Sequence, residues 1–195
     1  MVNVGICGQM ASGKTTLAEA LCNEISSYSK FSFAKSVKDF ANFLFDIPEG
    51  YKDREKYQKV GDGGRRFIGG NVWIDATLNA VYNKPESGWG IIDDVRYINE
   101  VQHLKKEGWF MVKINISEEL QEKRIKETYP DDWEQHLAAR THASEVEVAE
   151  ASESLFDLVI DADDGAIPVE ILIQAINGKK KQGHQQSGLS QHFGY

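Results

Sequence analysis

Eight residues near the N-terminus, GQMASGKT (8–15), carry two glycines, a lysine and a hydroxyl in the spacing G-x-x-x-x-G-K-[ST]. Glycine lets the backbone curl so tightly that successive N–H groups point inward at one anion. Lys14 can then reach the outer phosphates of a nucleotide, and the hydroxyl of Thr15 is suited to binding Mg²⁺. The pattern predicts a loop that binds ATP and Mg²⁺ through the following residues: Gly8, Ala11, Ser12, Gly13, Lys14, Thr15 and Thr16.

The segments on either side of this loop decide between a phosphate site and a chance glycine turn with a surface lysine. Residues 2–7 (VNVGIC) are a short apolar run typical of a buried strand, and apolar residues recur at helical spacing over 14–25. This context favours the phosphate site, because a helix that starts at the loop adds its positive dipole end. The loop occurs in several classes of protein. The short chain disfavours motors, and the lack of an N-K-x-D motif disfavours GTPases.

Two carboxylates and an arginine follow the apolar run at 90–92. The carboxyl ends of parallel strands border the crevice in which ligands bind, so Asp93 and Asp94 are candidates for a site. We expect Asp94 to hold Mg²⁺ through water or to orient an acceptor phosphate; the alternative is a helix N-cap. The role of Asp93 stays open. Arg96 is expected to bind phosphate through its planar guanidinium, or else to form an ion pair with Glu100 one turn later.

Further candidates between residues 38 and 73 are cations, an amide and an indole. Arg54 and Gln58 are four residues apart, so they share one face of a helix. The spacing fits a substrate-binding face and a solvated helix surface equally well. Arg65 and Arg66 follow a glycine-rich turn and could contact phosphate. Because adjacent side chains point apart, only one of them is expected to do so, and Arg65 is the candidate. Lys38 either approaches an acceptor phosphate or is exposed on an amphipathic helix. Trp73 either forms the wall of a base pocket or belongs to the core.

Residues 127–154 are charged and loop-like; Arg124 lies just before this segment and Arg140 lies within it. Such a segment suits a lid that closes over bound phosphates, whose arginines neutralise charge in the transition state. The alternative is a pair of solvated, salt-bridged helices. Glu145 is expected to have a structural role, capping a helix. No histidine and cysteine cluster has the spacing of zinc ligands, so we expect no protein-bound zinc.

Short apolar runs and helical patterns alternate along the chain. This alternation predicts an α/β fold, a parallel sheet with helices on both faces, and together with the loop it indicates a P-loop NTPase. Residues 178–195 are poor in apolar side chains and are expected to form a flexible tail. The expected strands are 2–7, 31–34, 90–93, 110–116 and 155–160, and the expected helices are 14–25, 37–45, 72–82, 99–106, 118–126 and 168–176.

Composition excludes several classes of protein. The net charge of −8 argues against a protein that holds DNA or RNA polymers, which need a basic face. No apolar window approaches the length of a membrane span, and MVNVGICG does not have the pattern of a signal peptide. Cys7 and Cys22 sit in apolar stretches and are expected to be buried thiols rather than a disulfide. We therefore expect a cytoplasmic protein that does not bind membranes.

Several segments outside the loop resemble the phage-type deoxynucleoside monophosphate kinase family, whose members are P-loop nucleotide kinases. Together with the loop they run in the family's order over roughly residues 1–175. The segments DVRYINE and THASE are more particular to the family than the loop is. The matching segments are FA (33–34) with Lys38, REKYQKVG (54–61) leading to Trp73, DVRYINE (94–100), THASE (141–145) and DLVI (157–160).

The resemblance implies an adenylate-kinase-like domain over 1–177, with an acceptor-binding region at 46–82, a lid-like segment at 124–154 and the tail at 178–195. It implies transfer of the γ-phosphate of ATP to a dNMP, giving dNDP and ADP. Arg54 would hold the monophosphate and Gln58 the base. The implied catalytic residues are Lys14, Arg96, Arg124 and Arg140, the substrate residues are Lys38, Arg54, Gln58, Gly61, Arg65, Trp73, Asp94, Arg96 and Glu100, and the metal residues are Thr15 and Asp94.

Two other functions remain open from the sequence. Another small-molecule kinase, such as one that acts on dephospho-coenzyme A, would keep the loop and use a different acceptor pocket. An ATP-dependent switch would use nucleotide binding to change a partner surface. The partners expected for the kinase are small nucleotides, and the sequence is equally compatible with a monomer and a homodimer.

Overall fold

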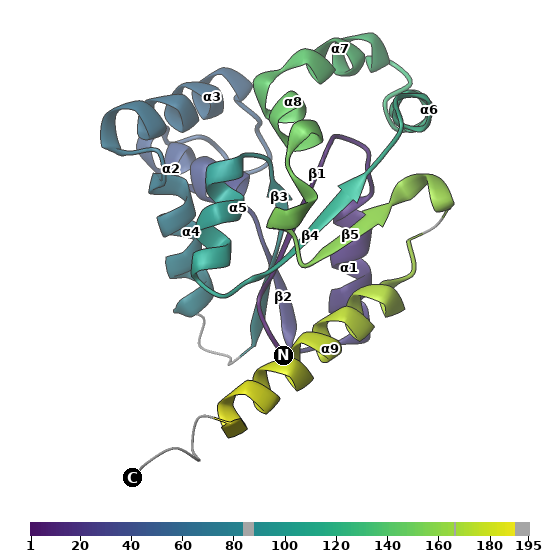
Figure 1. Ribbon diagram of the computed structural model, residues 1–195. Coiled ribbons are helices and arrows are strands. Elements are labelled where there is room, and N and C mark those ends of the chain that lie inside the picture. The colour runs from purple at the N-terminus through teal and green to yellow at the C-terminus, as the bar shows by residue number, and fades with distance from the viewer. Residues whose placement is uncertain (84–87, 166, 190–195) are drawn as a thin grey trace.

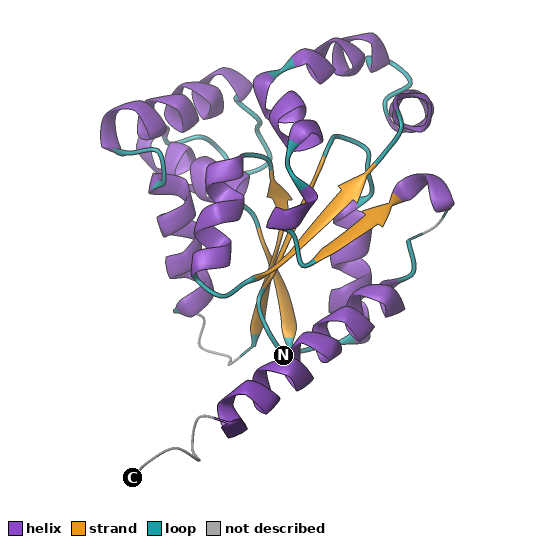
Figure 2. Cartoon of the chain, viewed as in Figure 1, coloured by secondary structure: helices purple, strands orange, loops and turns teal. Residues whose placement is uncertain are grey.

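The computed structural model describes residues 1–83, 88–165 and 167–189. Within them, five strands form one sheet in the order β2-β3-β1-β4-β5, and all neighbouring pairs are parallel (Figure 2). The strands are β1 (Val4–Gly8), β2 (Tyr28–Phe31), β3 (Trp89–Val95), β4 (Phe110–Asn115) and β5 (Leu158–Asp161). The predicted α/β fold with a parallel sheet is confirmed.

Helices cover both faces of this sheet, as the sequence predicts. Their bounds are α1 (Lys14–Glu24), α2 (Phe33–Phe45), α3 (Arg54–Gly63), α4 (Val72–Tyr82), α5 (Ile98–Lys106), α6 (Glu118–Thr128), α7 (Trp133–Ala138), α8 (Ala143–Glu150) and α9 (Val169–Leu189). One face carries α1 and α9, and the other carries α4, α5 and α8. In Figure 1, α3, α7 and α8 lie at the top of the view, at the end toward which the strands run. A site at that end therefore has helices around it.

The core consists of two apolar clusters, one on each face of the sheet. Leu17 and Leu21 of α1 pack with Leu172 of α9 in the first, and Ile74 of α4 packs with Leu104 of α5 in the second. Because both faces are covered, all five residues of β1 are buried. The central strand, which leads into the loop at 8–15, is thus held on both sides.

Polar capping residues shift several boundaries from those expected. The second strand ends at Phe31, because the Ser32 hydroxyl accepts a hydrogen bond from the backbone N–H of Lys35 (3.2 Å) and starts α2 at Phe33. The polar segment 46–64 contains α3, which has no strong apolar stripe. The Asp53 carboxylate caps this helix by accepting from the backbone N–H of Lys56 (3.0 Å).

The C-terminal helix is longer than the sequence indicates. It was expected to end at Ile176, but α9 continues to Leu189, so the expected tail is helical from 178 to 189. Residues 190–195, also part of that prediction, lie outside the described residues. Across the described part of the chain, no helix is long and apolar enough to cross a membrane. Cys7 is buried, Cys22 is half-buried, and they are not joined in a disulfide.

Candidate active site

The loop between β1 and α1 has the backbone geometry that a phosphate site needs. Ala11 and Gly13 both have positive φ values, 60° and 104°. Glycine adopts such values without strain, and alternation of left- and right-handed residues turns successive N–H groups to one side. At Gly8 a Cβ atom would lie 2.8 Å from the carbonyl oxygen of Ile114, so only glycine fits there. Both glycines of the motif are therefore required by the fold.

Lys14 lies buried at the start of α1. Its Nζ donates to the carbonyl oxygens of Gly8 (2.7 Å) and Gln9 (2.6 Å). Burial, and then the nearby positive charge of Arg96, lower the pKa of Lys14 to about 8. The ammonium is thus poorly solvated, and an added negative charge beside it would favour its protonated form.

Two side chains of one distant helix, α6, bind the loop. Nε2 of Gln121 donates to the carbonyl oxygen of Met10 (3.0 Å). Nη1 of Arg124, one turn later, donates to the carbonyl oxygens of Ala11 and Ser12, at 3.2 Å each. Three successive loop carbonyl groups thus have side-chain partners on α6.

A cavity of about 660 Å³ opens inside the loop, at the carboxyl ends of β1 and β3. Arg124 reaches this cavity as well as the loop carbonyls. Of the loop residues named from the sequence, Gly8 and Ser12 do not line it, and Ser12 is buried beneath. The other predicted residues that line it are Ala11, Gly13, Lys14, Thr15, Thr16, Asp94, Arg96 and Arg124.

Asp94 has a different set of contacts from that expected. Its carboxylate accepts from the Ser32 hydroxyl (2.8 Å) and from the backbone N–H groups of Phe33 (3.0 Å) and Ala34 (2.9 Å). It therefore caps α2, rather than the helix that follows it in the chain. Its neighbour Asp93 is 7% exposed, lines the same cavity and raises the pKa of Lys14 by its charge. Both carboxylates thus border the cavity, Asp93 paired with Lys30 at 3.7 Å and Asp94 bonded to the start of α2.

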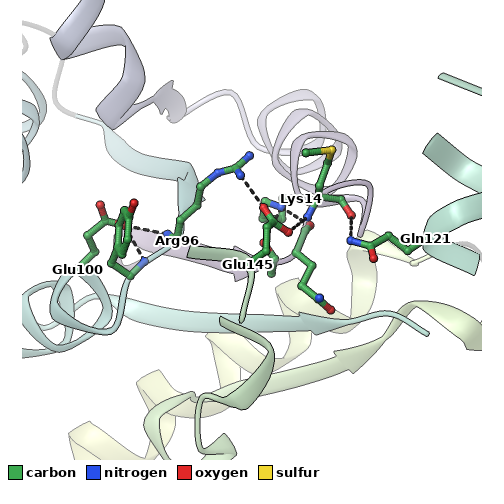
Figure 3. Close-up of polar contacts among 9 residues, drawn as sticks. Lys14, Arg96, Glu100, Gln121 and Glu145 are labelled. Atoms are coloured by element: carbon green, nitrogen blue, oxygen red, sulfur yellow. Dashed lines mark hydrogen bonds and ion pairs between the residues drawn. The ribbon is translucent and has the colours of Figure 1, made fainter. Parts of the chain in front are cut away.

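The expected ion pair between Arg96 and Glu100 is absent, and Arg96 has another partner. Its Nη1 donates to Oε1 of Glu145, on α8, at 2.7 Å (Figure 3). Glu100 instead accepts from the backbone N–H groups of Arg96 (2.8 Å) and Tyr97 (3.1 Å) at the start of α5. Burial raises the pKa of Glu100 to about 7. The Arg96 guanidinium is therefore free of Glu100 and reaches the space above the sheet.

A second cavity of about 340 Å³ adjoins the first. Ala34, Asp94 and Arg96 line both cavities, so the two meet at these residues. Its walls carry cations, aromatic rings and an amide. The residues named from the sequence that line it are Lys38, Gln58, Gly61, Arg65, Asp94, Arg96 and Glu100, and other lining residues are Phe33, Val37, Tyr57, Asp62, Tyr97 and His142.

Three residues expected in the site line neither cavity. Arg54 is exposed at the start of α3. Trp73 is buried, and its Nε1 donates to the carbonyl oxygen of Gly61 (2.9 Å), so the core alternative for Trp73 describes its place in the structure. Arg140 pairs with the exposed Glu118 at 3.0 Å, as in the alternative of a salt-bridged helical surface.

Two residues of the site were not found from the sequence as site residues. Glu145 was expected to cap a helix, but its Oε2 accepts from the backbone N–H of Met10 (2.7 Å) as well as pairing with Arg96. Gln121 also contacts Met10. The two residues are 135 and 111 positions from Met10 along the chain, and no motif spacing indicates a contact over that distance.

The residues around the first cavity fit Mg²⁺ and a nucleoside triphosphate. Mg²⁺ keeps several waters and takes one or two protein oxygens together with phosphate oxygens. Thr15 and Asp93 offer such oxygens, and the loop offers inward N–H groups with Lys14. In the described ranges, no cluster of three or more histidine, cysteine or acidic side chains forms a metal site, so the phosphates would supply most of the ligands.

Comparisons with known proteins identify the fold. Neither family models nor curated protein sequences give a match. Among solved structures, a gluconokinase from Sinorhizobium meliloti 1021 matches with a TM-score of 0.52 at 16% identity, covering 97% of both chains. An uncharacterized protein from Eubacterium ventriosum ATCC 27560 matches with a TM-score of 0.51 at 13% identity, covering 91% of this chain and 98% of its own. The chain thus shares its α/β fold with these two structures over nearly its whole length.

Proposed function

We propose that this protein transfers the γ-phosphoryl group of ATP to a deoxynucleoside monophosphate, giving a deoxynucleoside diphosphate and ADP. The observation that carries the proposal is the pair of adjoining cavities, which meet at Arg96. One contains the phosphate-binding loop, and the other is lined by cations and rings. A kinase needs a donor site and an acceptor site that share a boundary, because the attacking oxygen must lie in line with the γ-phosphorus.

Each side chain of the donor cavity has a role in this reaction. Bound MgATP supplies the phosphoryl group, with the metal neutralising charge on its phosphates. Lys14 and the loop N–H groups bind the phosphates, and Thr15 and Asp93 hold the metal side of the site. Arg96 stabilises charge that develops between donor and acceptor. A phosphate acceptor is already ionised at neutral pH, so no strong general base is needed.

The second cavity suits a nucleotide better than a small sugar acid. Its walls carry the cations Lys38, Arg65 and Arg96 and the acids Asp62, Asp94 and Glu100. Asp94 is bonded to the start of α2 and burial raises the pKa of Glu100 to about 7, so the three cations are available for the double charge of a monophosphate. Tyr57 and Tyr97 also line it and offer rings against which a base can pack. Its volume of about 340 Å³ suits a small ligand. Arg54 is exposed and outside this cavity, so we assign the acceptor phosphate to the three cations named here.

A panel of acceptors tests the proposal. Purified protein with MgATP is mixed in turn with each dNMP, each NMP, dephospho-coenzyme A and gluconate, and ADP release is measured. We expect ADP release to rise strongly with at least one dNMP. Turnover only with dephospho-coenzyme A or gluconate would replace the proposal with another small-molecule kinase. Slow ATP hydrolysis that no acceptor accelerates would favour a nucleotide-dependent switch.

The same proposal concerns the partners and the location of the protein. Its ligands would be small nucleotides, consistent with the net charge of −8, which suits neither nucleic acid polymers nor anionic membranes. Because ATP and nucleoside monophosphates are cytoplasmic metabolites, the proposed place of action is the cytoplasm, or the host cytoplasm for a protein of phage origin.

A further inference from the structure

A buried carboxylate joins the loop to the arginine between the cavities. Glu145 is 2% exposed, and each of its two oxygens has one partner. Oε2 accepts from the Met10 backbone N–H and Oε1 accepts from Nη1 of Arg96, both at 2.7 Å (Figure 3). Charge-assisted hydrogen bonds of this length are strong, and leaving such a carboxylate without partners in the interior is costly. The loop and Arg96 are therefore fixed relative to one another through a single side chain.

The helix that carries Glu145 is itself held at several points. Lys113, 4% exposed on β4, donates to the carbonyl oxygens of Ala149 (3.2 Å) and Ala151 (2.8 Å), where its charge complements the C-terminal end of α8. Glu147, also on α8, accepts from the backbone N–H of Ile98 (2.6 Å) at the start of α5. These contacts tie α8 to the sheet. The contacts bond α8, which lies within the expected lid, to β4 and α5.

Arg96 has capacity beyond its bond to Glu145. A guanidinium has five N–H donors, and the structure gives one of its nitrogens, Nη1, to Glu145. The side chain is 39% exposed and lines both cavities. The charges of Arg96 and Glu145 also act in opposite directions on Lys14, whose pKa Arg96 lowers and Glu145 raises. One side of Arg96 is thus anchored while the other faces the boundary between donor and acceptor.

We propose that Glu145 is a positioning residue that sets Arg96 against the phosphate-binding loop, so that one guanidinium contacts the transferring phosphoryl group. This inference rests on the proposed function and adds to it a residue that contacts neither substrate. Glu145 acts through Arg96 and Met10, which makes its effect on turnover depend on Arg96. A residue that only stabilised the fold would affect turnover equally whether or not Arg96 were present.

A double-mutant cycle tests this dependence. We expect Glu145→Gln to lower kcat by about tenfold or more with less than about a threefold change in KM for ATP, since its charge matters most in the transition state. In an Arg96→Ala background, the same change should alter kcat by less than about twofold. The matched control is Glu150→Gln, an exposed position on the same helix that has no role in holding α8, which should leave kcat unchanged. Equal losses from Glu145→Gln in both backgrounds, or an equal loss from Glu150→Gln, would overturn the proposal.

A second measurement needs no acceptor. Amide exchange at Met10 and the guanidinium NMR signals of Arg96 are compared in the wild-type protein and Glu145→Gln. We expect faster exchange and shifted signals in the variant, and no change in either would overturn the proposed contact. A response in both without phosphorylation of any acceptor would refute the kinase proposal alone. If Glu145→Gln does not fold, Arg96→Lys tests the pair from its exposed side, and wild-type kcat in that variant would refute the positioning role.

Discussion

The buried carboxylate of Glu100 makes stability depend on pH in a defined direction. Burial raises the pKa of this side chain from 4.5 to about 7, although it accepts hydrogen bonds from two backbone N–H groups. The folded state therefore keeps the proton of Glu100 at pH values where the unfolded chain has lost it. Because the folded state binds more protons, the free energy of unfolding falls as pH rises from 4.5 to about 7. Below pH 4.5 Glu100 is protonated in both the folded and the unfolded state, so its contribution to the free energy of unfolding is fully present.

The size of the effect follows from the shift. One pKa unit corresponds to about 1.36 kcal/mol, so the rise to about 7 amounts to about 3 kcal/mol. Glu100→Gln removes the ionisation but keeps an oxygen that accepts from the N–H groups of Arg96 and Tyr97. We expect the variant to gain up to about 3 kcal/mol relative to the wild type between pH 4.5 and 8. An effect of the glutamine amide nitrogen on stability that is the same at every pH leaves the pH dependence of the difference between the two proteins unchanged.

Urea unfolding at half-unit pH steps from 4 to 8 measures the difference between the two proteins. The matched control is Glu107→Gln, which makes the same substitution at the exposed C-terminal end of the same helix. Since other titrating groups are common to both proteins, their contributions cancel in the difference. A difference between wild type and Glu100→Gln that stays constant from pH 4 to 8 would refute the reasoning.

Three further predictions concern the site and its supports. Lys14→Ala should lower kcat by about a hundredfold or more without loss of fold, measured by turnover and thermal melting. Calorimetry of ATP binding in two buffers should show proton uptake above pH 8 in the wild type and none in this variant, because bound phosphate favours the protonated form of Lys14. Arg65→Ala should raise KM for the dNMP far more than KM for ATP, whereas Arg54→Ala should change neither; equal effects of the two variants would contradict the placement of the acceptor cavity. Gly64→Ala should destabilise the protein by about 1–3 kcal/mol, because its Cβ would lie 2.5 Å from a rigid indole ring, while Gly63→Ala, with nothing within 4 Å, should cost less in the same urea titration.

The sequence was most informative where structure depends on neighbours along the chain. The strand at 4–8, the glycine turn and the helix from Lys14 are encoded within one short stretch, so this strand–turn–helix unit could be predicted from the sequence. The parallel sheet followed from the alternation of apolar runs with helical patterns. The sequence placed Arg54 and Gln58 on one helix face but gave no bounds for α3, because REKYQKVG lacks an apolar stripe and the capping by Asp53 was not recognised.

Roles in the site were harder to predict because partners come from distant segments. Asp94 was expected to serve a metal or a phosphate, but it caps α2, 60 residues earlier in the chain. Arg96 lines both cavities, and the alternative of an ion pair with Glu100 was wrong, since its partner is Glu145. Arg54 and Arg140 had suitable chemistry, yet Arg54 is exposed and Arg140 is half-buried in a pair with Glu118. A residue type shows what chemistry is available, whereas only packing shows which group faces the ligand.

The sequence alone thus determined the glycine turn between the first strand and helix and the class of fold, because each depends on local spacing and periodicity. The tertiary structure decided which side chains converge on the loop. Glu145 reaches Met10 across 135 positions, since α8 packs beside β1 at the carboxyl end of the sheet. Contacts of this kind arise when a parallel sheet brings the ends of separate strands to one edge, and no spacing within the chain encodes them.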